Sequence, residues 1–170
     1  MKIDLGCGGN IKEGFYGVDF ETHNLNIFPY PWDSNSVDEV YMSHILEHLN
    51  NPVEVMREVY RIIKPNGLVT VKVPHVSGRC AWNNIEHNNV FNLDWCDSLV
   101  SGEGTTIKPL PFIVVSKCLH WSCSNYRIGH GRRFIDFLID YLVNLNVRIF
   151  ERLFIYWVGG VEEIEWVFKK

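Results

Sequence analysis

The feature that most constrains the fold is a glycine-rich turn between two short apolar segments near the N-terminus. Residues 3–5 have the composition of a buried strand and run directly into residues 6–10, whose sequence is GCGGN. A second strand-like segment follows at residues 15–18. The spacing of about ten residues is near the lower limit for a crossover between parallel strands. We therefore expect two neighbouring parallel strands whose connection holds at most a turn or two of helix.

The next segments continue the alternation of strand and helix. Asn51 is a good N-cap residue, Pro52 suits the first helical turn, and Glu54 stands where a capping box needs an acid. The apolar residues that follow recur at helical spacing until the KPNG sequence ends the helix. The predicted elements here are strands at 38–42 and 68–73 and a helix over 51–63. This order predicts an open α/β sheet with parallel strands.

The second half of the chain is less regular. Residues 75–111 read mainly as loops with a short helix at 94–101. Beyond them we predict a strand at 112–121, a helix or helix pair over 132–157 and a final strand at 161–168. No internal repeat or low-complexity linker divides the chain, so residues 1–170 are predicted to form a single domain.

Composition excludes several classes of protein. A formal net charge of −4 without a long basic run argues against a nucleic acid substrate. No apolar run approaches 18 residues and the N-terminus has no signal-like core, so we expect no membrane span. Five scattered cysteines are an odd number and suggest reduced thiols, hence a cytoplasmic protein.

The residues around the turn indicate which ligand it could bind. Glycine at positions 6 and 8 lets a ligand approach the backbone closely, although a tight turn without a ligand is also consistent with them. The dinucleotide fingerprint requires a third glycine at position 11, where this chain has Ile11. Asp4 suits an ammonium or sulfonium group, and Asp19 at the end of the second strand suits the two hydroxyls of a ribose. NAD is therefore the weaker prediction.

Four blocks of sequence together resemble a known family. Residues 4–10 (DLGCGGN) resemble motif I of class I methyltransferases. Residues 28–40 (FPYPWDSNSVDEV), 43–49 (SHILEHL) and 61–67 (RIIKPNG) resemble, in the right order, blocks of the type 11 group of that class. Pro74-His75 and Glu86-His87 are similar to features of a short subgroup associated with cell-surface polysaccharide synthesis.

The resemblance implies a Rossmann-like three-layer α/β sandwich. Its mixed seven-stranded sheet would have the order 3-2-1-4-5-7-6, with the seventh strand antiparallel. Relatives usually carry a helix before the first strand, and here the N-terminal helices are reduced. We therefore expect weaker cofactor binding than usual, or a partner chain that supplies the lid.

The resemblance also implies a cofactor, S-adenosylmethionine, and the residues that hold it. Its methionine part would contact the turn, its ribose the end of the second strand, and its adenine the residues that follow. Ser43 and His44 would line the methionine side. The full implied set is Asp4, Gly6, Cys7, Gly8, Asp19, Phe20, Asn24, Leu25, Ser43 and His44.

The implied reaction is methyl transfer to a small-molecule or glycan-type acceptor, at oxygen. A hydroxyl acceptor needs a base, and histidine suits that role near neutral pH. His75 and His87 follow the strand at 68–73 and are the predicted catalytic residues, unless they are loop histidines fixed to the backbone. His48, next to Glu47, is predicted to orient the loop rather than to act in catalysis.

Other readings stay open. The chain could be a degenerate methyltransferase that binds the cofactor or a partner without turnover, or it could act on RNA or protein. His120 with Cys118 and Cys123 lacks a fourth ligand, so no metal site is predicted. Two further groups have two interpretations each. Three arginines would contact either an anionic substrate or only solvent: Arg127, Arg132 and Arg133. A set of aromatic residues would form either core or the face of a homodimer: Phe150, Phe154, Tyr156, Trp157 and Trp166.

Overall fold

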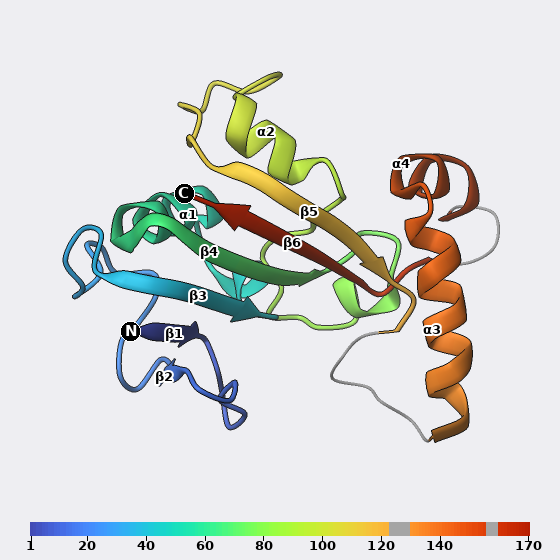
Figure 1. The fold of residues 1–170 in the computed structure, drawn as a ribbon, viewed down its shortest axis with the longest axis horizontal. Helices are drawn as coiled ribbons and strands as arrows, with labels where there is room; N and C mark the ends of the chain where they lie inside the picture. The colour runs from blue at the N-terminus through green and yellow to red at the C-terminus, as the bar shows by residue number, and fades with distance from the viewer. Residues whose placement is uncertain (123–129, 156–159) are drawn as a thin grey trace.

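The computed structural model describes residues 1–122, 130–155 and 160–170. Six strands form one sheet in the order β2-β1-β3-β4-β6-β5 (Figure 1). The first four along the chain are parallel, and β6 runs antiparallel to both β4 and β5. The strands are β1 (Lys2–Leu5), β2 (Tyr16–Val18), β3 (Val37–Ser43), β4 (Ile63–Pro74), β5 (Ile113–His120) and β6 (Glu163–Lys169).

Helices connect the strands from β3 onward. The α-helices are α1 (Pro52–Ile62), α2 (Trp95–Ser101), α3 (His130–Asn144) and α4 (Val147–Ile149), with 3-10 turns η1 (Leu46–His48) and η2 (Arg79–Ala81) and a π-helical turn η3 (Phe150–Phe154). The backbone N–H of Glu54 donates to the Asn51 side chain at 3.2 Å, so the predicted N-cap of α1 is confirmed. None of the described helices is long and apolar enough to cross a membrane.

The prediction of seven strands in the order 3-2-1-4-5-7-6 is wrong. Residues 19–36, which should supply the third strand at the edge, contain turns and no strand. This segment folds back on itself instead of extending, because Leu25 and Tyr30 are both buried and the Tyr30 hydroxyl donates to the Leu25 carbonyl at 2.9 Å. The six strands that are present keep the relative order that the prediction gave them.

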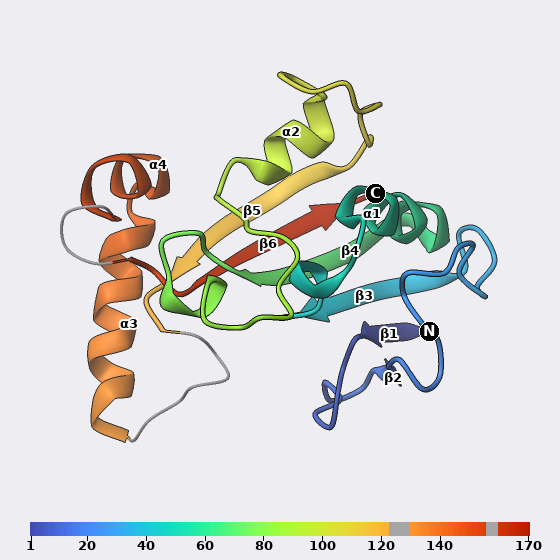
Figure 2. The same ribbon diagram turned by 180° about the vertical axis from the view of Figure 1, so that it is seen from behind.

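The predicted three layers are also not found. One face of the sheet is fully buried under α1, α2 and their connecting segments (Figures 1 and 2). The opposite face, here called the open face, carries partly exposed residues such as Tyr41, Thr70, Lys72, Glu165 and Val167. None of the described helices packs across it. The missing layer is the one that the abbreviated first crossover and the turns at 19–36 leave unformed.

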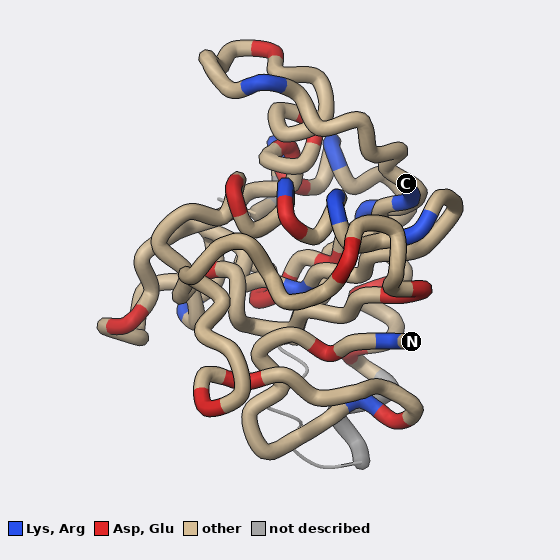
Figure 3. Tube along the Cα trace, turned by 90° about the vertical axis from the view of Figure 1, so that its left-hand side faces the viewer, with Lys and Arg blue, Asp and Glu red and all other residues tan. Residues whose placement is uncertain are grey.

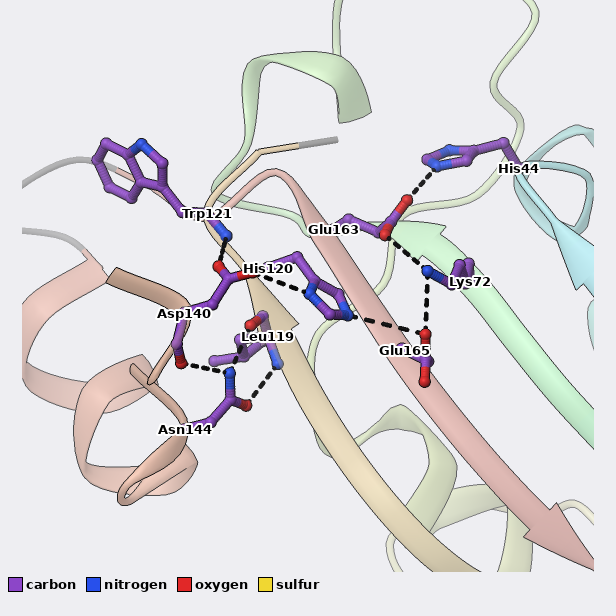
Figure 4. Close-up of polar contacts among 9 residues, drawn as sticks. All are labelled: His44, Lys72, Leu119, His120, Trp121, Asp140, Asn144, Glu163 and Glu165. Atoms are coloured by element: carbon purple, nitrogen blue, oxygen red, sulfur yellow. Dashed lines mark hydrogen bonds and ion pairs between the residues drawn. The ribbon is translucent and has the colours of Figure 1, made fainter. Parts of the chain in front are cut away.

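The predicted helix over 132–157 is divided. α3 ends at Asn144, and the Asn146 side chain then accepts the backbone N–H of Ile149 at 3.0 Å, which starts α4. α3 lies across the carboxyl end of β5, where the Asn144 amide bonds both the N–H and the carbonyl of Leu119 at 2.9 and 2.7 Å (Figures 1 and 4). Of the predicted aromatic set, Trp166 is fully buried in the core, while Tyr156 and Trp157 lie outside the described residues.

Charged residues of both signs are interleaved along the chain. Figure 3 shows Lys and Arg positions alternating with Asp and Glu, without a continuous basic stripe among the residues drawn in colour. A surface that binds nucleic acid would concentrate positive charge on one face.

Candidate cofactor site

The glycine-rich turn lies at the carboxyl ends of two neighbouring parallel strands, β1 and β2. Leu5 pairs with Val18, and the backbone N–H groups of Gly6 and Cys7 both donate to the Val18 carbonyl, at 2.7 and 3.3 Å. The turn is therefore fixed to the end of β2 immediately before Asp19. This side-by-side placement is the condition on which the predicted cofactor site depends.

The two predicted glycines have different functions in the turn. Gly6 has a φ of +72°, and a Cβ there would lie 2.2 Å from Cγ1 of Ile45, so this glycine allows close packing inside the protein. Gly8 has a φ of +53°, but a Cβ there would meet no atom within 4 Å. The space beside Gly8 is the open side of the turn, where a ligand can approach the backbone.

That space is a hollow of about 540 Å³ at the ends of β1 and β3. It includes six of the residues predicted to hold the cofactor, together with residues that the sequence did not single out. Its lining consists of Asp4, Gly6, Cys7, Gly8, Gly9, Asn10, Lys12, Tyr41, Ser43 and His44.

Asp4 is a buried carboxylate in the wall of this hollow, with 2% of the residue exposed. One oxygen accepts the backbone N–H of Lys12 at 2.8 Å. Burial raises the pKa of Asp4, and the bond and charge from Lys12 offset this only in part. Among the described residues, no cationic side chain forms an ion pair with it, and the ammonium of the nearby Lys12 lies over the Tyr41 ring, 3.9 Å from its centroid. A cationic ligand group in the hollow would supply the missing partner.

Asp19 lies close to the hollow without lining it. The pKa of the Cys7 thiol is raised by burial and then by the negative charges of Asp4 and Asp19, so both carboxylates are near Cys7. One Asp19 oxygen accepts the backbone N–H of Phe20 at 2.8 Å. The carboxylate is thus held at the end of β2, next to the turn, where the ribose was predicted to bind.

The residues predicted near the adenine differ in how accessible they are to a ligand. Phe20 is 74% exposed, so its ring is accessible to a ligand. Leu25 is only 4% exposed and packs in the core, and the Asn24 side chain accepts the backbone N–H of Asn26 at 3.0 Å. The Leu25 side chain therefore supports the segment from inside, which leaves its backbone as the part that an adenine could contact.

His44 forms the wall of the hollow after β3. It is one of three non-glycine residues with positive φ in the described part of the chain, at 54°, and its ring lies between two carboxylates. Nε2 is 2.7 Å from Oε2 of Glu163, and Nδ1 is 3.3 Å from Oε1 of Glu47 (Figure 4). Glu163, on β6, was not predicted from sequence, since nothing in a local motif connects it to residues 119 positions earlier.

The structure corrects the role predicted for His75. Its ring is fully buried, Nδ1 accepts the backbone N–H of Ser77 at 3.0 Å, and Nε2 donates to Glu151 at 2.9 Å. Burial alone would raise the pKa of Glu151, but the hydrogen bonds from His75 and from the Leu93 N–H, together with nearby positive charge, outweigh it and the pKa is lowered. With both ring nitrogens bonded and no solvent contact, His75 cannot take a proton from a substrate in the hollow. It fixes the segment after β4 to η3.

His87 lies elsewhere, beside η1. Its Nδ1 is 3.2 Å from the Ala81 carbonyl, its Nε2 is 4.0 Å from Oε1 of Glu47, and its ring packs edge-on against that of His48 with centroids 4.7 Å apart. The sequence predicted that His48 and Glu47 orient this loop. The structure brings both of them together with His87.

A chain of charged side chains crosses the open face beside His44 (Figure 4). Lys72 lies 3.4 Å from Glu163 and 3.0 Å from Glu165, and these ion pairs hold its pKa above the usual value although burial would lower it. His120 pairs with Asp140 at 3.2 Å and lies 3.8 Å from Glu165, which raises its pKa to about 9.

These contacts bear on two further predictions. His120, which the sequence grouped with Cys118 and Cys123, lies beside two carboxylates, while Cys123 lies outside the described residues. Of the three predicted arginines, Arg127 is outside the described residues, and the side chains of Arg132 and Arg133 are not described.

The comparisons with known proteins agree with this geometry. Residues 9–71 match the methyltransferase domain family. A structure of an S-adenosylmethionine-dependent methyltransferase from Archaeoglobus fulgidus is 16% identical, covers 99% of this chain and 85% of its own, and has a TM-score of 0.54. The chain has the fold of S-adenosylmethionine-dependent methyltransferases. Among curated proteins, none matches its sequence.

Two other structures share the methyltransferase fold. Phosphoethanolamine N-methyltransferase 2 of Haemonchus contortus, in complex with S-adenosylmethionine, is 13% identical with a TM-score of 0.55, over 99% of this chain and 48% of that one. A chain of the complex between the Haloferax volcanii Trm112 methyltransferase activator and a methyltransferase is 14% identical with a TM-score of 0.54, over 99% and 81%. The family match over residues 9–71 and these structures agree on the methyltransferase fold.

Proposed function

We propose that this chain transfers the methyl group of S-adenosylmethionine to a hydroxyl oxygen of a small-molecule or glycan-type acceptor. The observation that carries the proposal is the hollow beside Gly8, whose wall holds a buried carboxylate without a cationic partner among the described residues. A ligand with an ammonium and a sulfonium group fits such a site better than an anion does. The scattered cysteines favour a cytoplasmic location.

Particular residues are proposed to hold the cofactor. Asp4 would bind the amino group, the backbone at Gly8 and Gly9 would border the methionine part, and Asp19 would accept the ribose hydroxyls. Phe20 would pack on the adenine, because its ring is exposed just after Asp19. The bound cofactor supplies an activated methyl group.

The main task of the protein is then alignment. Holding an acceptor oxygen in line with the methyl group can contribute roughly 7–11 kcal/mol to lowering the barrier. Of the two histidines predicted to act as bases, only His87 keeps a ring nitrogen without a hydrogen bond among the described residues, so it remains the substrate-side candidate.

Calorimetry with S-adenosylmethionine and S-adenosylhomocysteine tests cofactor binding directly. We expect the wild-type chain to bind both and Asp4→Asn to bind them more weakly, since the variant removes the negative charge but keeps the shape. Formation of S-adenosylhomocysteine in the presence of sugars, nucleotide-sugars, alcohols and amines then tests the acceptor. Failure of correctly folded protein to bind either compound would refute the proposal.

The alternative is a module that binds the cofactor or a partner without turnover. The open face favours it, because one side of the sheet lacks the helical layer that would cover it. The occupant that we propose under this alternative is a second copy of the chain, since the open face carries charges of both signs. Cofactor binding without methyl transfer to any acceptor, together with a dimer in multi-angle light scattering, would support it.

A further inference from the structure

We propose that Glu47, His48 and His87 form a binding site for a divalent transition-metal ion beside the cofactor hollow. The nearest potential ligand atoms of the three residues all lie within 4.8 Å of one another. The proposal gives Nε2 of His87 to the ion in place of the substrate-side role considered above. It does not depend on the identity of the cofactor or the acceptor.

The first observation is the state of Glu47. The residue is 1% exposed, yet neither carboxylate oxygen accepts a hydrogen bond from any described residue. Its nearest polar neighbours are ring nitrogens of His44 at 3.3 Å and His87 at 4.0 Å. A buried carboxylate is expensive unless it is hydrogen-bonded, paired or bound to a metal. A positively charged partner would therefore stabilise the two carboxylate oxygens.

The second observation is the orientation of the two imidazoles. Nδ1 of His48 is 3.2 Å from the Glu86 carbonyl, and Nδ1 of His87 is 3.2 Å from the Ala81 carbonyl. A carbonyl only accepts, so each Nδ1 carries the hydrogen and each Nε2 keeps its lone pair in the neutral ring. Metal-binding histidines are held in this way, by an N–H bond from the second ring nitrogen to a carbonyl or carboxylate.

The backbone around the cluster is fixed before any ion binds. The N–H groups of Asn88 and Asn89 both donate to the Glu47 carbonyl, at 2.8 and 3.1 Å. Their side-chain amides donate to the carbonyls of His48 and Leu49, at 2.8 and 2.7 Å. The loop that carries His87 is thus attached to η1, which carries the other two ligands. In a tetrahedral site the ligand atoms would be about 3.4 Å apart, so small side-chain movements suffice.

The donor set indicates the class of ion. Two imidazole nitrogens and one carboxylate favour Zn²⁺, Mn²⁺, Fe²⁺ or Co²⁺ over Mg²⁺ and Ca²⁺, which prefer oxygen ligands. Three protein ligands also leave coordination positions for water or another molecule. His44, which contacts Glu47, lines the cofactor hollow, so the ion would lie one side chain away from it.

Binding of Mn²⁺ to chelator-treated, full-length protein, measured by electron paramagnetic resonance, tests the site without interference from thiols. We expect one ion per chain, and a loss of at least tenfold in affinity in Glu47→Gln and in His87→Gln. His23→Gln is the matched control, because it removes an imidazole that packs against Tyr30 and Trp32 instead. With Co²⁺, the visible spectrum should show nitrogen and oxygen ligands without thiolate charge-transfer bands.

Two results would overturn the inference. One is wild-type binding of Mn²⁺, Co²⁺ and Zn²⁺ no tighter than millimolar, and the other is equal affinity in wild type, Glu47→Gln and His87→Gln.

Stability of the metal-free variants provides an independent check. Glu47→Gln should be at least as stable to urea as wild type, because it removes a buried charge without hydrogen bonds. A marked loss of stability would show that the protein itself satisfies this carboxylate.

Discussion

Nε2 of His44 lies 2.7 Å from Oε2 of Glu163, which links the loop after β3 to the start of β6 across 119 residues of sequence. Glu163 is 1% exposed and also contacts Lys72 at 3.4 Å. One wall of the cofactor hollow is consequently held by the last strand of the sheet. The shape of the hollow therefore depends on correct pairing of the C-terminal strands as well as on the N-terminal turn.

Alanine at Gly6 should mainly lower stability, whereas alanine at Gly8 should mainly weaken cofactor binding. Gly6→Ala should lower the free energy of unfolding by roughly 2–5 kcal/mol, since left-handed backbone strain adds to overpacking against Ile45. Gly8→Ala carries the strain alone, about 1–2 kcal/mol, but its methyl group would enter the hollow and weaken cofactor binding. Urea unfolding and calorimetry separate the two, and equal destabilisation would contradict the assignment.

Asp19→Ala should weaken S-adenosylmethionine binding by roughly 1–3 kcal/mol, because ribose hydroxyls would lose their acceptor. Asp19→Asn should recover part of the loss, since its amide oxygen can still accept one hydrogen bond. Calorimetry on both variants measures this. An affinity unchanged in Asp19→Ala would mean that the ribose is held elsewhere.

His75→Ala should lower the free energy of unfolding by roughly 2–3 kcal/mol, because it removes the hydrogen-bond donor of a charged carboxylate, Glu151. Cofactor affinity should stay unchanged in protein that remains folded. Urea unfolding and calorimetry provide the two readouts. A variant of wild-type stability that has lost only turnover would restore His75 as the base.

Stability should fall at alkaline pH through His120. Its folded pKa, about 9, lies above the ordinary value of 6.5, so its contribution is complete below pH 6.5 and is lost as the pH rises through about 9. At about 1.4 kcal/mol per pKa unit, the loss is bounded at about 3 kcal/mol. Urea unfolding between these pH values should show it in wild type and much less in His120→Gln. Equal slopes would show that His120 is not paired as described.

The sequence predicted the elements better than their arrangement. The helix at 51–63 and the strands on either side followed from the Asn51 cap and from local periodicity, and α1 spans Pro52–Ile62. The seventh strand came from the family pattern alone, and the burial of Leu25 and Tyr30 overrode it. The break after α3 depends on one side chain, Asn146, capping α4 within an apolar stretch.

In the candidate site, too, contacts within one short segment could be predicted, and contacts between distant segments could not. Asp4 and the glycines adjoin in sequence, and their place in the hollow could be predicted, whereas the contact of Glu163 with His44 and that of Glu47 with His87 could not. The two partners are 119 residues apart in the first case, where strand order brings them together, and 40 in the second, where the loop at 88–89 bonds to η1. His75 and His87 were grouped by position after β4, but burial separates a structural histidine from one with an unbonded nitrogen.

The contact between Asn144 and Leu119 occupies the outer edge of the sheet where β5 ends. The amide uses the donor and the acceptor that an added β-strand would need at this point of β5. At the other border, β2 offers only three residues. A strand recruited from another chain would have to pair with β5 before Leu119 or with the short β2, so neither border offers a full-length edge.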